Sequence, residues 1–276
     1  MNPAKKMKRI RTLIGRLLDI LTYIEFLVPT DIRSQFTVYQ KSEISCTPYV
    51  AIVVMFKTVK EVDSDLMQTL RYLSKLNYEV VVVANANPSQ RVLKEFSKNF
   101  SIISRPNIGR DFGAYKVGLG WITQNIRKEP LDRLILLNDS VKWTPAAIEA
   151  CLSRAELSRQ SLLGVTTSRQ RNLHIQSYFY FVKDTAIDVF IEKFLDLKDV
   201  RMKRSIIHLG ERKISKVLLK NGLQFDALFS ERELERERRN NSSSEEVLHL
   251  TSRPVNTINY YSRELRNLSD GIIKKA

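Results

Sequence analysis

Cysteine and histidine are scarce in this sequence. Only two cysteines, Cys46 and Cys151, and three histidines occur among its 276 residues. Both cysteines lie in or beside apolar segments, so we expect two structural thiols in a reducing compartment. His174, His208 and His249 lie far apart in the sequence and show none of the short ligand spacings of zinc sites, which argues against zinc.

Uncharged hydrophobic runs are short. No run of about 18 apolar residues occurs, so we expect no membrane-spanning helix. Arg16, Asp19 and Glu25 interrupt the apolar positions near the basic N-terminus, and no small-residue cleavage site follows, which argues against a secretory signal. The sequence therefore predicts a cytoplasmic protein.

Acidic residues are outnumbered by basic ones. The chain has 45 lysines and arginines against 30 acidic residues, a formal net charge of +15. This excess favours an anionic partner, which could be nucleic acid, a membrane surface or a phosphate-bearing substrate. Because no basic module with interleaved aromatic residues is recognisable, we expect no nucleic-acid partner. The apolar content of 43% is enough for a full core, which excludes disorder as the main state.

Residues 1–45 are expected to form a basic amphipathic helical segment. Its apolar residues recur at helical spacing, and lysines and arginines surround them. The apolar positions are Ile10, Ile14, Leu17, Leu18, Leu21 and Ile24, and the basic ones are Lys5, Lys6, Lys8, Arg9, Arg11 and Arg16. Two interpretations stay open: the stripe packs on the domain, or the helix lies on an anionic bilayer surface.

Buried strands and helices alternate after position 48. The β-branched runs at 49–56, 78–84 and 101–104 are typical of strands buried on both faces. Helices that begin near Asp63 and Arg91 separate these strands. The alternation predicts βαβ units and a mainly parallel sheet.

The segment RPNIGRDFGAY, residues 105–115, joins the strand at 101–104 to a further helix. Gly109 and Gly113 allow the backbone to approach a ligand closely, and the free N–H groups of a new helix favour a phosphate. Arg110 adds the several N–H donors of its guanidinium group. The segment matches neither the P-loop nor the dinucleotide fingerprint, so a tight turn with Asp111 as the helix cap stays open as the alternative.

The segment LILLNDS, residues 134–140, is a short buried strand that ends in Asn138, Asp139 and Ser140. A carboxylate at a strand end can hold a divalent cation that neutralises a diphosphate, and Asp139 is the candidate ligand for Mg²⁺ or Mn²⁺. One carboxylate beside an amide is weaker evidence for a metal site than a pair of carboxylates would be. A turn in which the Asn or Asp side chain bonds the backbone is the competing interpretation.

The segment HIQSYFYFV, residues 174–182, alternates polar and aromatic residues and predicts a single strand. One face would carry Ile175, Ser177, Phe179 and Phe181, and the other His174, Gln176, Tyr178 and Tyr180. The second face could receive a sugar, with His174 and Gln176 as candidate binding residues. A half-buried strand without a ligand is the alternative.

Four segments resemble, in the same order, the rhamnan synthesis protein F family of polysaccharide assembly proteins. They are NIGRDFGAYKVGL, LILLNDSV, HIQSYFYFV and ERKISKVLLKNG. That family is similar to GT-A glycosyltransferases. The resemblance implies a GT-A-like α/β domain over 46–229, with a mixed, mainly parallel sheet flanked by helices. A charged flexible linker over 230–246 and a C-terminal helical tail over 247–276 that packs on the domain would follow.

The resemblance also implies a nucleotide-sugar donor pocket. Asn107, Gly109, Arg110 and Asp111 would line this pocket, and Asp139 would face the metal and the diphosphate. Asn138 stands where the family motif of that fold has an Asp, which leaves metal dependence open. Arg110 or Lys116 would then carry part of the diphosphate charge.

Sugar transfer requires a general base that deprotonates the acceptor. Glu211 is the candidate base, with His208 as the alternative. The resemblance implies transfer of rhamnose or another deoxyhexose from a nucleoside diphosphate to a lipid-linked bacterial surface glycan, with peripheral contact at the cytoplasmic face of the inner membrane. The rival hypothesis is a non-catalytic scaffold that keeps the nucleotide-sugar fold within an envelope glycan complex.

Overall fold

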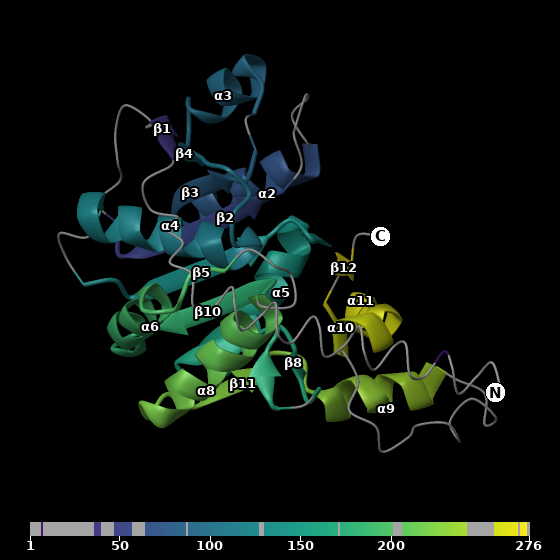
Figure 1. Cartoon of the computed structure of the whole chain (residues 1–276). Helices are drawn as coiled ribbons and strands as arrows, with labels where there is room; N and C mark the ends of the chain where they lie inside the picture. Colours follow the sequence, from purple (N-terminus) through teal and green to yellow (C-terminus); the bar gives the residue numbers. More distant parts are fainter. Residues whose placement is uncertain are drawn as a thin grey trace.

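A computed structural model describes residues 36–39, 47–56, 64–86, 88–126, 130–170, 172–200, 206–241, 257–269 and 271–274, and Met7. Its centre is an eight-stranded sheet (Figure 1). From edge to edge the strands are β1 (Thr37–Tyr39), β4 (Ser101–Ser104), β3 (Glu79–Ala84), β2 (Tyr49–Met55), β5 (Arg133–Asn138), β10 (Phe179–Lys183), β7 (Leu162–Gly164) and β11 (Phe225–Ala227).

The middle of the sheet is parallel and its margins are mixed. β4, β3, β2 and β5 run in one direction, β10 is antiparallel to both β5 and β7, and β11 is parallel to β7. Val50 to Val54 in β2 are completely buried, as the continuous β-branched run requires. The predicted mixed, mainly parallel α/β sheet is confirmed.

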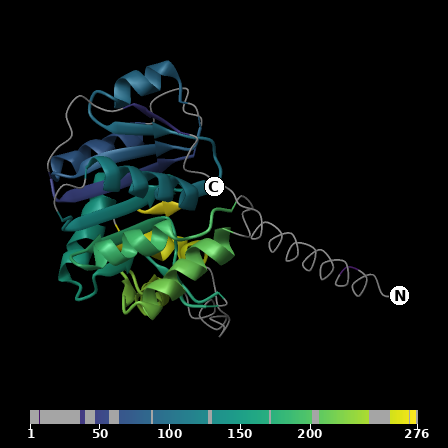
Figure 2. The same ribbon diagram turned by 60° about the vertical axis from the view of Figure 1, so that its left-hand side comes forward.

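Helices cover both faces of the sheet (Figures 1 and 2). One apolar core lies under α4 (Arg110–Asn125), α6 (Ala186–Leu195) and α8 (Arg212–Lys220). The other core lies under α2 (Ser64–Lys75), α3 (Gln90–Phe96) and α5 (Pro145–Leu157).

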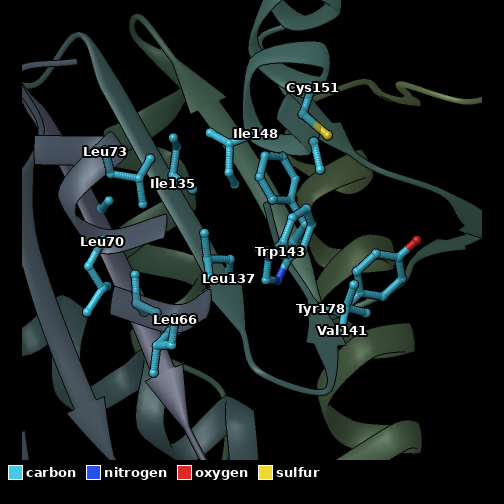
Figure 3. Close-up of a cluster of buried hydrophobic side chains, with 14 of the residues drawn as sticks. Leu66, Leu70, Leu73, Ile135, Leu137, Val141, Trp143, Ile148, Cys151 and Tyr178 are labelled. Carbon is cyan, nitrogen blue, oxygen red and sulfur yellow. The ribbon is translucent and has the colours of Figure 1, made fainter. Parts of the chain in front are cut away.

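The second core explains one of the cysteines. Figure 3 shows Leu70 of α2 and Ile148 of α5 on either side of Ile135, with Cys151 further along α5. Cys151 is fully buried, and burial raises the pKa of its thiol, so it is an unreactive packing residue. Cys46 lies outside the described residues.

The expected single strand over 174–182 is wrong. It is broken into β9 (His174–Ile175), which pairs with β8 (Thr167–Ser168), and β10, with an interruption at 176–178. β10 is buried on both faces, because it lies between β5 and β7 with helices above and below. The prediction of a half-exposed strand therefore fails as well.

The expected flexible linker over 230–246 is corrected for most of its length. Residues 231–241 form helix α9 (Glu231–Asn241), and Leu234 is buried in the core. Arg154 donates two hydrogen bonds to Glu233, of 2.9 and 3.1 Å, which fix α9 to α5. The carboxylates of Glu233 and Glu235 thus bond neighbouring elements, and residues 242–246 lie outside the described part.

The C-terminal segment packs on the domain beside α9 (Figure 1). It comprises α10 (Thr257–Tyr260), α11 (Ser262–Leu268) and β12 (Ile273–Lys274), which pairs with β6 (Val141–Lys142). Ile258, Tyr261 and Leu265 are buried in the core. The helical segment predicted over 1–45 is wrong at 37–39, which form the edge strand β1 of the sheet. Apart from Met7, the predicted amphipathic helix itself lies outside the described residues, as do residues 247–256. In the described ranges, no helix is both long and apolar enough to cross a bilayer.

Two glycines of α4 give a matched stability test. A methyl group at Gly113 would lie 2.2 Å from the Ile108 carbonyl oxygen, whereas one at Gly120 would meet no atom within 4 Å. We expect Gly113→Ala to destabilise the fold by about 1–3 kcal/mol through overpacking. Gly120→Ala should stabilise it by about 0.5–1 kcal/mol through helix propensity. Urea unfolding of both variants measures this, and equal effects of the two would contradict the packing described.

Candidate functional site

Three parallel strands end at one edge of the sheet, and their ends are bonded to one another. The Asp139 backbone N–H donates to the Val54 carbonyl at 3.0 Å, and the Asp139 Oδ1 accepts the Phe56 N–H at 3.1 Å. The Asn85 N–H reaches the Met55 carbonyl at 2.9 Å. The residues that follow β2, β3 and β5, which are Phe56, Asn85 and Asp139, therefore form one continuous rim, as expected at the carboxyl ends of parallel strands.

Arg105 shapes the loop that follows β4. Its side chain is 1% exposed, and its guanidinium donates to the Asn85 side-chain oxygen and to the Ile108 carbonyl. Burial lowers the pKa of Arg105 to about 10, so it stays charged at neutral pH. The sequence analysis did not single out this residue, although an arginine directly after a buried strand could have been the signal.

Helix α4 begins without a side-chain cap. Gly109 is the capping residue, with φ of 75°, and Arg110 follows with φ of 51°, a left-handed conformation that is strained for a non-glycine residue. Asp111 therefore lies in the first turn and is not the helix cap. Asn107 and Arg110 are exposed, and their side chains have no bonding partner within the described residues. They are available to a ligand at the positive end of the helix.

Two carboxylates meet at one hydroxyl in the interior of this rim. The Ser177 hydroxyl lies 2.7 Å from Asp111 Oδ2 and in even closer contact with Glu211 Oε1. The Ser177 N–H donates to the same Glu211 oxygen at 3.1 Å, and the Asn138 amide lies 3.4 Å from Asp111 Oδ2. A hydroxyl has one proton, so only one of its two carboxylate contacts can be donated by serine. In the second contact the serine oxygen must be the acceptor, which requires a proton on that carboxyl group.

The electrostatics of this pair agree with a shared proton. Burial, and after it the charge of Glu211, raises the pKa of Asp111 to about 6, although the Ser177 hydrogen bond opposes the shift. Burial also raises the pKa of Glu211. Two carboxylates that share one hydroxyl are not both ionised without a cost, so a proton is retained up to about pH 6.

Glu211 is held at the site by an irregular helix. It ends the π-helical turn η1 (Ile207–Glu211), and a methyl group at Gly210 would lie 3.0 Å from the Phe112 ring of α4. Single π-helical turns occur frequently at functional sites. The structure thus brings Asp111, Asn138 and Glu211 together from distant parts of the sequence. The side chain of His208, the alternative base, lies outside the described part.

His174 borders the cluster as a neutral ring. Its Nδ1 lies 2.8 Å from the Asn172 carbonyl, and its Nε2 lies 3.9 Å from Glu211 Oε2. Burial lowers the pKa of His174, and the carbonyl contact places the ring proton on Nδ1. His174 therefore presents a lone pair towards Glu211 and no positive charge.

Lys116 and Gln176 lie away from the cluster. The Lys116 ammonium is 2.6 Å from an Asp199 carboxylate oxygen and also bonds the Leu197 carbonyl. The Gln176 carbonyl oxygen accepts the Thr166 hydroxyl at 2.7 Å and the Ile258 N–H at 3.1 Å. Both side chains hold the fold together, whereas Ser177, which the sequence analysis placed on the opposite face from the sugar site, is the centre of the cluster.

Asn138 forms a local turn next to the candidate metal ligand. Its side-chain oxygen accepts the Ser140 N–H at 3.1 Å and the Ser140 hydroxyl at 2.5 Å, which is the turn expected as the competing interpretation of this segment. Over the described residues, no three His, Cys, Asp or Glu side chains gather to hold a metal ion. Asp139 would be the protein ligand of a cation that also binds a diphosphate.

The fold and the cluster define an α/β protein with a proton-sharing carboxylate pair at the carboxyl ends of its parallel strands. The profile of rhamnan synthesis protein F matches residues 80–250, and the chain belongs to this family, as the four segments predicted. An uncharacterized protein of Sinorhizobium fredii is 30% identical over 195 residues, which are 65% of this chain and 48% of that protein. The chain thus spans about half the length of that relative.

The chain is also similar to several solved structures. Inositol-1-phosphate CTP transferase from T. maritima has 8% identity and a TM-score of 0.38, with 68% of this chain and 88% of that one covered. S. aureus TarS 1-349 has 8% identity and a TM-score of 0.38, with 80% of this chain and 81% of that one covered. Glucosyl-3-phosphoglycerate synthase from Mycobacterium tuberculosis, in complex with Mn²⁺, UDP and phosphoglyceric acid, has 14% identity and a TM-score of 0.33. The similarity covers 64% of this chain and 80% of that one.

The raised pKa of Asp111 predicts a pH-dependent stability difference. Between its ordinary value of 3.8 and about 6, the folded protein holds a proton that the unfolded chain has released, so stability falls as pH rises through this window. Asp111→Asn removes this loss, so we expect its stability relative to wild type to improve between pH 4 and 7, by up to about 3 kcal/mol. Urea unfolding across this range measures it.

The matched control is Asp132→Asn, at an exposed aspartate without a side-chain partner among the described residues. The difference in unfolding free energy between this variant and wild type should not show the same increase between pH 4 and 7. A pH-independent difference between wild type and Asp111→Asn would contradict a buried, proton-sharing Asp111.

Proposed function

We propose that the protein is a glycosyltransferase that moves a sugar from a nucleoside diphosphate donor to a glycan. Its family membership supports this assignment. The observation that carries it is the Asp111–Ser177–Glu211 cluster beside the exposed Arg110, at the start of α4. The cluster offers a proton acceptor, and the helix start offers positive charge, within one rim of the sheet.

The start of α4 is the proposed diphosphate subsite. Arg110 and Asn107 supply donors on side chains that are not engaged elsewhere in the described part, and the first N–H groups of the helix add to them. These groups would stabilise the charge that develops on the leaving diphosphate. A cation held by Asp139 would neutralise the same charge when bound.

Glu211 is the proposed general base. Its Oε1 is fixed by the Ser177 N–H and hydroxyl, which leaves Oε2 to accept the proton of an acceptor hydroxyl. A pKa raised by burial brings the carboxylate closer to the pH at which a base works well. Below about pH 6, Asp111 retains a proton, which lowers the repulsion that a second full negative charge would impose on Glu211.

The family name, rhamnan synthesis protein F, supports the proposed donor sugar. Rhamnose, or another deoxyhexose, is the proposed sugar, and a lipid-linked bacterial surface glycan is the proposed acceptor. A lipid-linked acceptor lies at a membrane, which gives the basic residues of 1–45 a role at the cytoplasmic leaflet.

A non-catalytic scaffold is the second candidate function. The observation in its favour is that Asn138 is engaged in a local turn and that Asp139 Oδ1 accepts a backbone N–H, so the segment offers only one carboxylate for a metal. Such a protein would bind a nucleotide sugar and not turn it over. The two functions differ in turnover, which the following experiment measures.

Purified protein incubated with nucleotide sugars tests the transferase directly. We expect release of nucleoside diphosphate, which Glu211→Gln lowers about 10²- to 10⁴-fold because the general base is lost. Ser177→Ala should have a smaller effect, since Glu211 keeps the backbone N–H. Asp132→Asn is the control and should keep full activity. Binding without turnover in wild type would favour the scaffold, and full activity of Glu211→Gln would refute its role as base.

Thermal unfolding with a panel of nucleotide sugars identifies the donor. We expect the matching donor to raise Tm by mass action, equivalent to about 2.7 kcal/mol at a hundredfold excess over Kd. Arg110→Ala should weaken this shift, whereas Arg91→Ala, at an exposed position of α3, should not. Repeating the titration with Mg²⁺ or Mn²⁺, in wild type and in Asp139→Asn, shows whether the cation acts through Asp139. An unchanged Tm with every donor would contradict the proposed pocket.

A further inference from the structure

Helix α9 carries three arginines on the face opposite its buried leucine. Leu234 is fully buried, and the residues opposite it on the helix, at i, i+4 and i+7, are Arg232, Arg236 and Arg239. All three are exposed. We call these three residues the arginine stripe; it extends about 10 Å along the helix.

The acidic residues of α9 bond the rest of the protein. Glu233 accepts both hydrogen bonds from Arg154, and Glu235 accepts the Tyr261 hydroxyl at 3.2 Å. Glu237 accepts amide hydrogens from Asn241 and Asn267. A helix with equal numbers of acidic and basic residues thus directs its carboxylates to neighbouring side chains and three of its arginines to solvent.

The arginine stripe has no partner within the described residues. None of its guanidinium groups forms an ion pair, a hydrogen bond or a ring contact there, whereas Arg238, on another side of α9, bonds Glu264 at 2.9 Å. A hollow of about 590 Å³ lies over the stripe, lined also by Ser230, Glu233 and Glu235. Three unpaired guanidinium groups in one hollow form a concentrated positive surface.

We propose that the arginine stripe is a contact surface for an anionic phospholipid bilayer. Guanidinium groups bind phosphate through paired N–H donors, and each basic side chain near an anionic bilayer adds to the attraction. Because Leu234 faces the core, α9 cannot insert and binds through charge alone. The proposal is independent of sugar transfer, since it concerns a surface and not the reaction.

Nucleic acid fits this surface less well than lipid headgroups do. None of the described residues that line the hollow is aromatic, so they offer bases no stacking platform. Glu233 and Glu235 border the hollow and would repel a continuous phosphate backbone that follows the helix. Separate headgroups can occupy the positions of the three arginines without approaching these carboxylates.

Vesicle co-sedimentation of the full-length chain tests the surface. We expect binding to phosphatidylglycerol-containing vesicles, weak binding to pure phosphatidylcholine vesicles, and a decrease with added salt. The triple variant Arg232→Gln, Arg236→Gln and Arg239→Gln should lower the partition coefficient at least about tenfold. Its fold should persist, because the replaced side chains have no partner in the described part.

The matched control removes three positive charges from the other end of the molecule, near α3 (Figure 1). Lys75, Arg91 and Lys94 are exposed and are replaced by glutamine. This variant should bind vesicles as wild type does. Equal losses in both variants, wild-type binding by the stripe variant, or a loss of single-stranded RNA binding with vesicle binding unchanged would each overturn the proposal.

Discussion

The buried guanidinium of Arg105 is the contact on which the candidate site depends. It bonds the end of β3 through Asn85 and the loop through the Ile108 carbonyl, so the path from β4 into α4 is fixed by one side chain. The absence of a side chain at Gly113 allows this close approach. The position of Asp111 follows, because it lies in the first turn of the helix that this loop begins. A charge buried in this way is costly unless it is bonded, and the loop folds tightly around the guanidinium so that both of its terminal nitrogens donate, while the buried Nε has no hydrogen-bond partner among the described residues.

The same principle applies to the carboxylate pair. Asp111 and Glu211 come from elements about 100 residues apart, and their mutual repulsion opposes the packing of η1 on α4. Ser177 resolves the conflict, since its N–H and hydroxyl supply donors and a retained proton removes one charge. The arrangement lowers stability above the pKa of Asp111. Protein sites that perform acid–base chemistry characteristically accept this kind of cost.

The sequence predicted the strands and helices more reliably than the contacts between them. β4 has the predicted bounds, because a short apolar run between polar residues leaves little choice. A local pattern indicates Asn138, whereas the family resemblance implies the donor-site role of Asp111 and supports Glu211 as the base. The broken strand at 176–178 could not be predicted, since its alternation is normal and only the pairing of β9 with β8 interrupts it. The roles of Ser177 and Arg105 depend on partners far away in the sequence. Helix α9 has a composition that also suits a linker, and its order depends on Arg154 and Glu264.

The C-terminal segment adds a constraint that no local pattern contains. β12 pairs with β6, directly after the Asn138–Asp139 turn, while the Ile258 N–H bonds Gln176, the neighbour of Ser177. Residues 257–274 therefore connect the two loops that carry the cluster, and the buried Ile258 and Leu265 anchor this connection in the core. The separation of Asn138 from Ser177 is set first by the pairing of β5 with β10, in which the Asn138 N–H donates to the Tyr178 carbonyl at 3.2 Å. The C-terminal segment then holds both loops without contributing a side chain to the carboxylate cluster. Gln176, predicted as a sugar ligand, takes part in this connection: its buried amide oxygen accepts the Ile258 N–H and the Thr166 hydroxyl, which fixes the loop next to Ser177.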